Sequence, residues 1–400
     1  MHKLMWILLV VGLLAAPLFA QSVVPLEANL TEDCVTDYDP DVDYFPDKIE
    51  ITDAENFTVA YFNHYKVITV LDAFDNAAPF TYVLVQCGAP MPDATDFPPG
   101  TQFIEVPIQE IIVMSTTQIP HLDDLGLLDS LIGVDSFLYI SNPAVRERID
   151  AGTLVEVGSG NMVNVELVLD LDPDLVMTYG FNPDFDAHPV LIDAGVVTAL
   201  NAEWREATPL GRAEWIKYTA LFFNAEAKAE QVYAEIVAAY NETRELAASV
   251  AETQRPLVLW NTFLSFNDAW SIPGAQTYIG ALTRDAGGTI ALGDLAPEDS
   301  ALVSFEVVYD GALDADIWLT NAFAVNTLSD LLAEDSRYAD FAAFQAGNVW
   351  NNDLDVNENF GNNFYELGVT NPHLILRDLV AIFHPDLLPD HEFRFFRRLE

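Results

Sequence analysis

The stretch NAEAKAEQVYAEIVAAYNETRELAASVAET, residues 224–253, decides how the rest of the chain is interpreted. It contains no Gly or Pro and is rich in strong helix formers, so it predicts one long helix. Apolar or small residues at positions 229, 232, 236, 239 and 243 recur at spacings of three and four. Asn224 is placed to cap the start, and Arg255-Pro256 marks the stop. At full length the helix would extend about 45 Å, and we expect it to connect two lobes.

Short apolar strands and helices alternate on both sides of this helix, from Phe103 to Leu200 and again from Leu257 to Phe383. Such alternation predicts α/β lobes with parallel sheets covered by helices, and a charged tail after Phe383. Residues 57–87 alternate with period two and predict an additional β-rich segment. The predicted divisions are a signal segment at 1–20, an N-terminal tail and β-rich extension at 21–100, an N-terminal lobe at 101–223, the helix at 224–253 and a C-terminal lobe at 254–400.

The chain of 400 residues is half apolar, which leaves room for two hydrophobic cores. It carries 62 acidic against 17 basic residues, a net charge of −45. This charge disfavours nucleic acid and anionic membrane surfaces as partners. It is compatible with high solubility, with adaptation to salt, and with attraction to a basic partner.

The first residues have the pattern of a secretory signal. Met1-His2-Lys3 is basic, residues 4–16 are apolar but short for a bilayer span, and Pro17 to Ala20 is similar to a cleavage region. We expect cleavage after Ala20 and a periplasmic or secreted protein, with an uncleaved membrane anchor as the alternative. Cys34 and Cys87 are the only cysteines, and in an oxidising compartment we expect a disulfide between them.

Several segments, in order, carry a family resemblance. They are PIQEIIVMSTTQIPHLDDLGLLDSLIGV (107–134), VNVELVLDLDPDLVMTY (163–179), AEAKAEQVYAEI (225–236), LTRDAGGTI (282–290), SFEVVYDGALDADIWLT (304–320) and FHPDLLP (383–389). The chain resembles the substrate-binding proteins of ABC importers, in the branch that handles ferric siderophores, haem and cobalamin. The segment around residues 49–88 resembles an N-terminal extension of one subset, with Cys34 and Cys87 in matching places.

The resemblance implies two α/β lobes joined by one long helix, a ligand cleft between them and little hinge bending. It implies capture of a bulky chelate and its delivery to a membrane permease, with no catalysis and no intrinsic cofactor. In the family, one Glu on each lobe pairs with Arg on the permease. By motif position these are Glu166 and Glu306, each two residues after a capping residue.

Ligands of open parallel sheets bind beyond the carboxyl ends of the strands, and this rule selects the candidate residues. The loops that the rule selects are 114–118, 139–142, 179–185, 260–270, 321–326 and 351–365. They are rich in aromatic and amide side chains, which suit a large and nearly neutral ligand. Because basic residues are scarce nearby, with only Arg146, Arg205 and Arg212 in reach, we favour a hydroxamate-type ferric siderophore or a corrinoid over an anionic chelate. The candidate ligand-binding residues are Thr116, Thr117, Tyr139, Tyr179, Phe181, Trp260, Phe263, Trp270, Phe323, Asn359 and Phe360.

Three alternatives stay open from the sequence. A free metal ion would use His121, His188 and His373 with carboxylates, although no HxH or HExxH spacing is present and we assign no metal site. Haem would use Tyr179 or Tyr139 as its iron ligand. A metal-inserting enzyme with the same lobe topology is the alternative of a different class, but the chain has no GxSxG, P-loop or GxGxxG motif.

Overall fold

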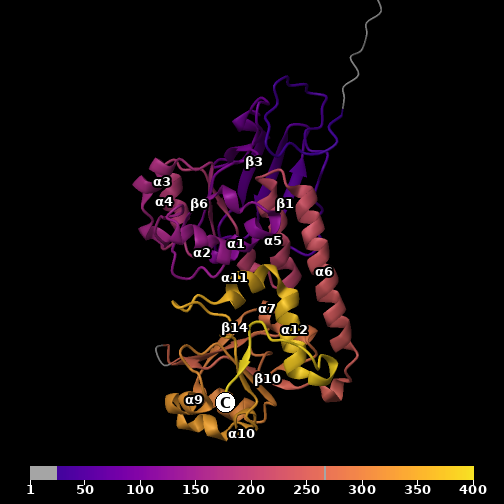
Figure 1. The fold of residues 1–400 in the computed structure, drawn as a ribbon, viewed down its shortest axis with the longest axis vertical. Coiled ribbons are helices and arrows are strands. Elements are labelled where there is room, and N and C mark those ends of the chain that lie inside the picture. The colour runs from indigo at the N-terminus through magenta and orange to yellow at the C-terminus, as the bar shows by residue number, and fades with distance from the viewer. Residues whose placement is uncertain (1–24, 265–266) are drawn as a thin grey trace, which may run out of the picture.

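A computed structural model describes residues 25–264 and 267–400. The predicted signal segment at 1–20 therefore lies outside the described residues. Two α/β lobes lie one above the other in Figure 1, with the long helix α6 (Glu226–Ala248) running beside both. A β-rich extension forms the end of the molecule beyond the N-terminal lobe. Within the described residues, no helix combines the length and the apolar character needed to cross a membrane.

The extension is a four-stranded sheet in the order β1-β2-β3-β4. The first three strands form an antiparallel meander, as their alternating sequence predicts, and β4 then pairs parallel to β3. The sequence analysis predicts that the extension ends at residue 100. Its fourth strand, however, lies at 102–106, just before the N-terminal lobe begins. The strands are β1 (Phe57–Tyr61), β2 (Tyr65–Val70), β3 (Phe80–Gln86) and β4 (Gln102–Val106).

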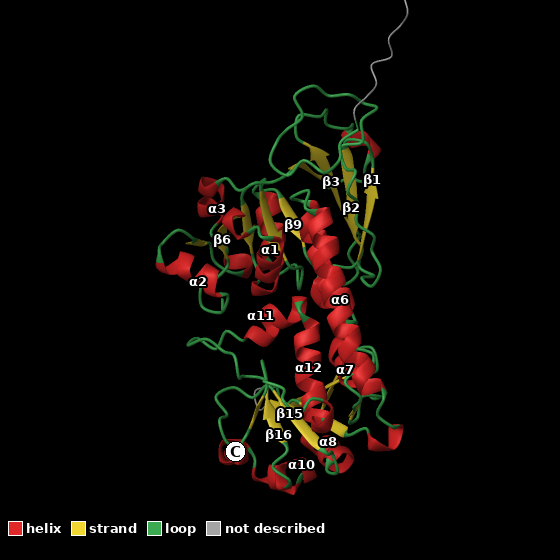
Figure 2. Cartoon of the chain, turned by 45° about the vertical axis from the view of Figure 1, so that its right-hand side comes forward, coloured by secondary structure: helices red, strands yellow, loops and turns green. Residues whose placement is uncertain are grey.

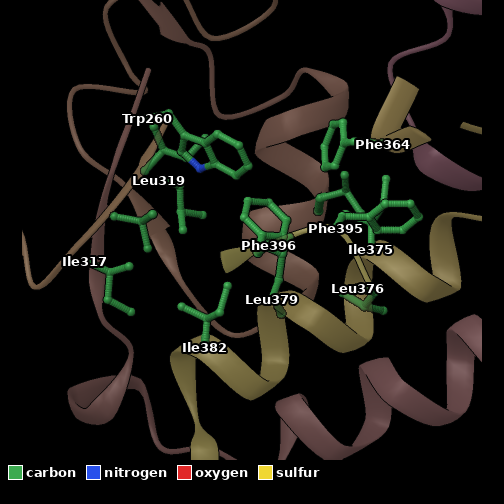
Figure 3. Packing of buried hydrophobic residues seen from close by; sticks show 14 of the residues in the cluster. Trp260, Ile317, Leu319, Phe364, Ile375, Leu376, Leu379, Ile382, Phe395 and Phe396 are labelled. Atoms are coloured by element: carbon green, nitrogen blue, oxygen red, sulfur yellow. The ribbon is translucent and has the colours of Figure 1, made fainter. Parts of the chain in front are cut away.

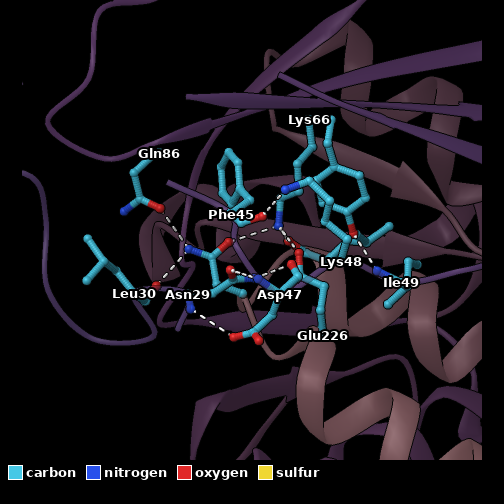
Figure 4. Close-up of polar contacts among 12 residues, drawn as sticks. Asn29, Leu30, Phe45, Asp47, Lys48, Ile49, Lys66, Gln86 and Glu226 are labelled. Atoms are coloured by element: carbon cyan, nitrogen blue, oxygen red, sulfur yellow. Dashed lines mark hydrogen bonds and ion pairs between the residues drawn. The ribbon is translucent and has the colours of Figure 1, made fainter. Parts of the chain in front are cut away.

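A fully buried charge network fastens the extension to the start of α6 (Figure 4). Lys66 Nζ on β2 donates to Glu226 Oε1 at 2.7 Å, and both side chains are fully buried. Asn29 Nδ2 donates to the other carboxylate oxygen of Glu226 at 2.8 Å. Asn224 does not cap α6 as predicted. Its backbone φ is +55°, and its side chain bridges Lys66, Leu30 and Gln86 instead.

The chain before β1 is a strap, residues 47–56, that lies across α5 (Pro209–Leu221) and α6. Glu214 Oε2 accepts from the backbone N–H groups of Asp53 and Ala54, both at 2.7 Å. Glu206 accepts from Asn56, and Glu230 accepts from Glu50. A disulfide joins Cys34 to Cys87 and so ties the residues ahead of the strap to the end of β3. The sequence analysis predicts an extended tail before residue 55. Hydrogen bonds to helices far along the chain hold the strap, which includes the end of that tail, in a fixed position.

The N-terminal lobe contains a parallel five-stranded sheet in the order β7-β6-β5-β8-β9. Its strands are short, and those at the centre are buried on both faces, as expected for a parallel sheet between helices. The strands are β5 (Ile111–Val113), β6 (Leu131–Val134), β7 (Val155–Glu156), β8 (Leu175–Thr178) and β9 (Thr198–Leu200); the helices are α1 (Ile119–Leu125), α2 (Pro143–Asp150), α3 (Val165–Leu171) and α4 (Ala187–Asp193).

Helix α5 (Pro209–Leu221) packs between the two lobes and is buried almost all round. Trp215 and Tyr218 belong to the core of the N-terminal lobe, whereas Ile216 and Ala220 pack into the core of the C-terminal lobe. Helix α6 packs along α5 and α12 and is 23 residues long, or about 35 Å, which is shorter than predicted. Its buried stripe is Ala229, Tyr233, Ile236, Tyr240, Thr243 and Ala247.

The C-terminal lobe is built on a sheet in the order β13-β10-β15-β16-β17, parallel except for β17. Its core packs α12 against this sheet (Figure 3). The strands are β10 (Leu257–Trp260), β13 (Thr289–Ile290), β15 (Ile317–Thr320), β16 (Val349–Asn351) and β17 (Arg397–Arg398); the helices are α7 (Tyr278–Asp285), α8 (Phe305–Ala312), α9 (Leu328–Glu334), α10 (Ala342–Gln345), α11 (Asn363–Thr370) and α12 (Pro372–Phe383).

Three features of this lobe depart from the sequence analysis. A small antiparallel sheet, β11 (Phe263–Leu264), β12 (Ala269–Pro273) and β14 (Ser300–Val303), replaces an expected loop. Helix α11 occupies part of another expected loop and lies between the lobes (Figure 2). The expected charged tail is anchored by Phe395, Phe396 and Leu399, which are buried in the core.

Candidate ligand-binding cleft

A cleft of about 740 Å³ opens between the two lobes. Residues that follow β5, β6 and β8 line it from the N-terminal lobe, and residues that follow β15 and β16 line it from the C-terminal lobe. This is the position that the strand-end rule predicts for a parallel sheet. The lining residues are Met114, Ser115, Thr116, Asp135, Tyr139, Tyr179, Asn321, Ala322, Phe323, Ala324, Asn326, Asn352, Asp353, Val356, Phe360, Gly361, Asn362, Tyr365 and Arg397.

Large aromatic side chains in the cleft remain exposed. The rings of Phe323 and Phe360 contact each other at a tilt of 49° with centroids 4.2 Å apart, yet their exposed fractions are 68% and 51%. Tyr139 approaches from the opposite lobe and is also exposed. An exposed aromatic cluster inside a concave site leaves apolar area available for a bulky ligand.

Five of the predicted ligand-binding residues come together in this cleft, namely Thr116, Tyr139, Tyr179, Phe323 and Phe360. Two more lie beside it without lining it. The Thr117 hydroxyl lies 2.9 Å from Ser115 Oγ, and the Asn359 backbone N–H donates to Asn357 Oδ1. Phe181 is 66% exposed but lines a second cavity.

The remaining three predicted residues lie outside the cleft lining. Trp270 is fully buried in β12, where its indole donates to the carbonyl of Trp260 and its ring lies against Trp318. Trp260 points into the core toward Phe396 (Figure 3). Phe263 packs on Phe305. Trp260 on β10, Phe263 on β11 and Trp270 on β12 pack against core residues, so we leave them out of the ligand site.

The second cavity, of about 990 Å³, adjoins the first at Tyr365, which lines both. Residues from the extension, from both lobes and from α11 surround it. Its two arginines are already engaged, because Arg205 pairs with Asp72 and Asp75, and Arg212 lies over the Tyr278 ring and donates to the carbonyl of Trp204. The sequence analysis proposed these two arginines as possible ligand contacts, but both side chains already interact with other residues of the protein.

The charged residues of the cleft are ones that the sequence analysis missed. Asp135 follows β6 and Asp353 follows β16, so each lobe contributes one carboxylate. Arg397 Nη2 donates to Asp353 Oδ2 at 2.7 Å, which neutralises one of the two. Asp353 lies in a loop that the strand-end rule selects, but the sequence predicted a strand over 133–140 and so placed Asp135 inside it. Neither residue stood out among 62 acidic residues.

Two neighbouring carboxylates affect Tyr179. Burial, reinforced by the charges of Asp186 and Asp135, raises the pKa of the Tyr179 phenol. Coordination of iron by a tyrosine requires the phenolate, which these charges disfavour. The electrostatics of the cleft therefore weigh against the haem alternative through Tyr179.

A polar contact between the lobes, here called the edge contact, joins residues 138–142 to residues 357–366. Glu366 on α11 accepts from the backbone N–H of Ser141 at 2.6 Å and of Asn142 at 2.7 Å, at the start of α2. Asn357 Nδ2 donates to the carbonyls of Leu138 and Ile140. Glu366 is almost fully buried, and burial raises the pKa of its carboxyl group to about 7.

The histidines considered for metal binding are separate from the cleft. His121 contacts Thr219 and His188 contacts Thr178, both in buried surroundings, and burial lowers the pKa of each to about 3. His373 is on α12. Within the described part of the chain, no group of three or more His, Cys, Asp or Glu side chains is arranged to hold a metal ion.

Glu166 and Glu306 are exposed in the first turns of α3 and α8, one on each lobe. Exposed apolar side chains accompany both, with Met162 and Leu169 near Glu166 in sequence and Leu302 and Val307 near Glu306. The two sites differ in charge, because Arg337 lies 3.4 Å from Glu306. Hydrogen bonds from its own backbone N–H and from the Ser304 side chain lower the pKa of the Glu306 carboxyl, and the charge of Arg337 lowers it further.

Two parallel-sheet lobes, a helical connection and a cleft at the strand ends define a two-lobe α/β binding protein. The chain belongs to the periplasmic binding protein family, whose model matches residues 111–353. The described fold agrees with the one that the sequence resemblance implied.

The chain is also similar to several relatives in sequence and to solved structures in fold. An uncharacterized lipoprotein of Methanocaldococcus jannaschii is 24% identical over 306 residues, which cover 73% of this chain and 69% of the relative. A cobalamin-binding protein of Halobacterium salinarum is 26% identical over 254 residues, or 60% and 62% of the two chains. The apo periplasmic haem-binding protein RhuT from Roseiflexus is similar in fold, with a TM-score of 0.52, 21% identity, and coverage of 70% of this chain and 99% of that one.

Proposed function

We propose that this protein is the extracytoplasmic solute-binding component of an ABC importer. It captures an iron-siderophore-type chelate or a corrinoid in the interlobe cleft and delivers it to a permease. The observation that carries this proposal is the 740 Å³ cleft, lined by exposed aromatic and amide side chains from both lobes. Membership of the family and the lipoprotein relatives support an extracytoplasmic location.

The chemistry of the cleft favours a bulky and nearly neutral ligand. Phe323, Phe360 and Tyr139 supply apolar contact area, and Asn321, Asn352 and other amides supply hydrogen bonds without net charge. The alternatives of a free metal ion and of haem lack comparable support. The histidines are buried elsewhere, and the carboxylates near Tyr179 oppose its ionisation.

Docking to the permease would use Glu166 and Glu306. Both are exposed, both are flanked by apolar side chains, and each belongs to a different lobe. A permease surface with two arginines would match them, and complementary charges set the orientation of such complexes. Glu306 would exchange its contact with Arg337 for the permease arginine, whereas Glu166 forms no ion pair with the described residues.

Binding and transport of a labelled corrinoid and of a neutral ferric hydroxamate test the proposal. We expect the charge reversals Glu166→Lys and Glu306→Lys to abolish uptake while ligand affinity stays within twofold of the parent protein. Asp170→Lys, a reversal at another exposed acid of α3, is the matched control and should preserve uptake. Loss of ligand affinity in either Glu variant would contradict the docking role. Binding of neither ligand by the parent protein would refute the proposed ligand class.

A further inference from the structure

Asp135 is the cleft residue whose charge the protein leaves unbalanced. It directly follows β6, and its backbone is fixed by hydrogen bonds to Val113 and Gly158. The neighbouring Glu156 carboxylate is the charged group that acts on its side chain, and it adds like charge. Within residues 25–264 and 267–400, no Lys or Arg forms an ion pair with it.

The other two charged groups of the cleft pair with each other. Arg397 donates to Asp353 Oδ2 and also to the carbonyls of Val325 and Asn326, at 2.8 and 2.9 Å, whereas Asp353 Oδ1 is buried without a partner among the described residues. The positive charge of Arg397 is therefore held within the C-terminal lobe. With Asp353 and Arg397 cancelling, Asp135 gives the lining a net formal charge of −1.

We infer that Asp135 determines the charge specificity of the cleft, by accepting a hydrogen bond from an N–H group of a neutral or cationic ligand and by repelling anionic ones. The inference rests on the proposed function and narrows its ligand class. A partly buried carboxylate without a cation is costly in the empty cleft, and a ligand donor would relieve that cost. The raised pKa of Asp135, about 6 and caused mainly by burial, agrees with this reasoning.

The same carboxylate acts against a negatively charged chelate. A ligand with exposed carboxylates or catecholates would bring like charge into a site where the lining offers no unpaired arginine. Burial makes such repulsion stronger than at the surface, and specificity of this kind arises as much from rejection as from attraction. Amide-bearing corrinoids and neutral peptide hydroxamates carry N–H donors and no net negative charge, as Asp135 requires. Ferric catecholates and haem are anionic and do not meet this requirement.

The test compares the parent protein with Asp135→Asn, which removes the charge and keeps the size. Both are titrated by calorimetry with cyanocobalamin, a neutral ferric trihydroxamate that carries peptide N–H groups, a ferric triscatecholate and haem. We expect the substitution to weaken binding of the preferred neutral ligand by about ten- to a hundredfold, because a hydrogen bond to a charged acceptor is lost. Affinity for the two anionic ligands should stay equal or rise.

Asp193→Asn is the matched control, since it removes one negative charge from an exposed position on α4 of the same lobe. It should leave all affinities unchanged, and equal melting temperatures would show that both variants are folded. Unchanged affinity of Asp135→Asn for the neutral ligand, or preference of the parent protein for an anionic one, would overturn the inference alone. Binding of none of the four ligands would overturn the proposed function and the inference together.

Discussion

Two of the contacts that hold the lobes together are built from different chemistry. Beside α6 the contact is mostly apolar, is strengthened by α5 packing into both cores, and adjoins the buried Lys66–Glu226 pair, which fastens the extension to α6. The edge contact at the cleft is polar and consists of hydrogen bonds to Glu366 and Asn357. Apolar packing with a buried ion pair stabilises the folded state, whereas a few hydrogen bonds contribute little net stability and can exchange with water. We therefore expect the α6 side to preserve the fold and the edge contact to open during ligand exchange.

The largest effect should come from the buried pair beside α6. Replacing Lys66 with Met leaves the Glu226 carboxylate without its cation, and we expect a loss of about 3–5 kcal/mol in the free energy of unfolding. Chemical denaturation of the parent protein and the variant measures this loss of stability. The control is Lys48→Met, which removes the exposed ion pair with Asp43 and should cost about 1 kcal/mol or less. Equal losses of stability in the two variants would contradict the claim that the buried ion pair matters more than the exposed one.

A slightly smaller effect is expected at the disulfide on the same side of the molecule. Replacing Cys34 and Cys87 with Ser releases a loop closed over a separation of 53 residues. In the chain-entropy model this costs about 4 kcal/mol of stability. Denaturation of the parent protein with and without reductant, beside the double variant, measures the cost. A double variant as stable as the oxidised parent would show that the bridge contributes nothing.

The edge contact should give the smallest effect, and one that depends on pH. The Glu366 carboxyl has its pKa raised by burial from 4.5 to about 7, so the folded state binds its proton more tightly than the unfolded state. Stability contributed by this group is therefore fully present below pH about 4.5 and is lost as pH rises through about 7. The total change is at most about 3 kcal/mol.

Comparison of the parent protein with Glu366→Gln from pH 5 to pH 8 isolates this group, because Asp135 titrates equally in both. The stability of the parent relative to the variant should fall as pH rises. Glu358→Gln, an exposed neighbour, should show no such trend. A relative stability that increases with pH would mean that the hydrogen bonds from Ser141 and Asn142 outweigh burial.

The connecting helix and the α/β lobes were predictable because their patterns are local. Residues 224–253 carry helix-forming composition and periodicity, and the buried strands are continuous apolar runs. Helix α11 was missed because Asn362 and Asn363 read as loop residues. The structure shows Asn362 capping the helix, and the buried Glu366 reaching α2 of the other lobe.

The candidate site was predictable only in outline. The strand-end rule selected loops that line the cleft, but it could not distinguish Tyr139 and Phe323, which remain exposed, from Trp260 and Trp270, which are buried on β10 and β12. Asp135 and Glu366 looked like ordinary surface acids in so acidic a chain. Their burial distinguishes Asp135 and Glu366 from the surface acids. Burial depends on contacts between segments up to 225 residues apart, which a local sequence pattern does not show.

The strap at residues 47–56 has a consequence for the order in which the chain is assembled. Its backbone N–H groups bind carboxylates of Glu206, Glu214 and Glu230, which follow 150 to 180 residues later in the chain. During synthesis the strap emerges long before α5 and α6 exist, and contacts over such separations form late because closing the loop costs entropy. The strap is therefore synthesised long before the helices that hold it, and we expect it to be among the last segments to reach its folded position.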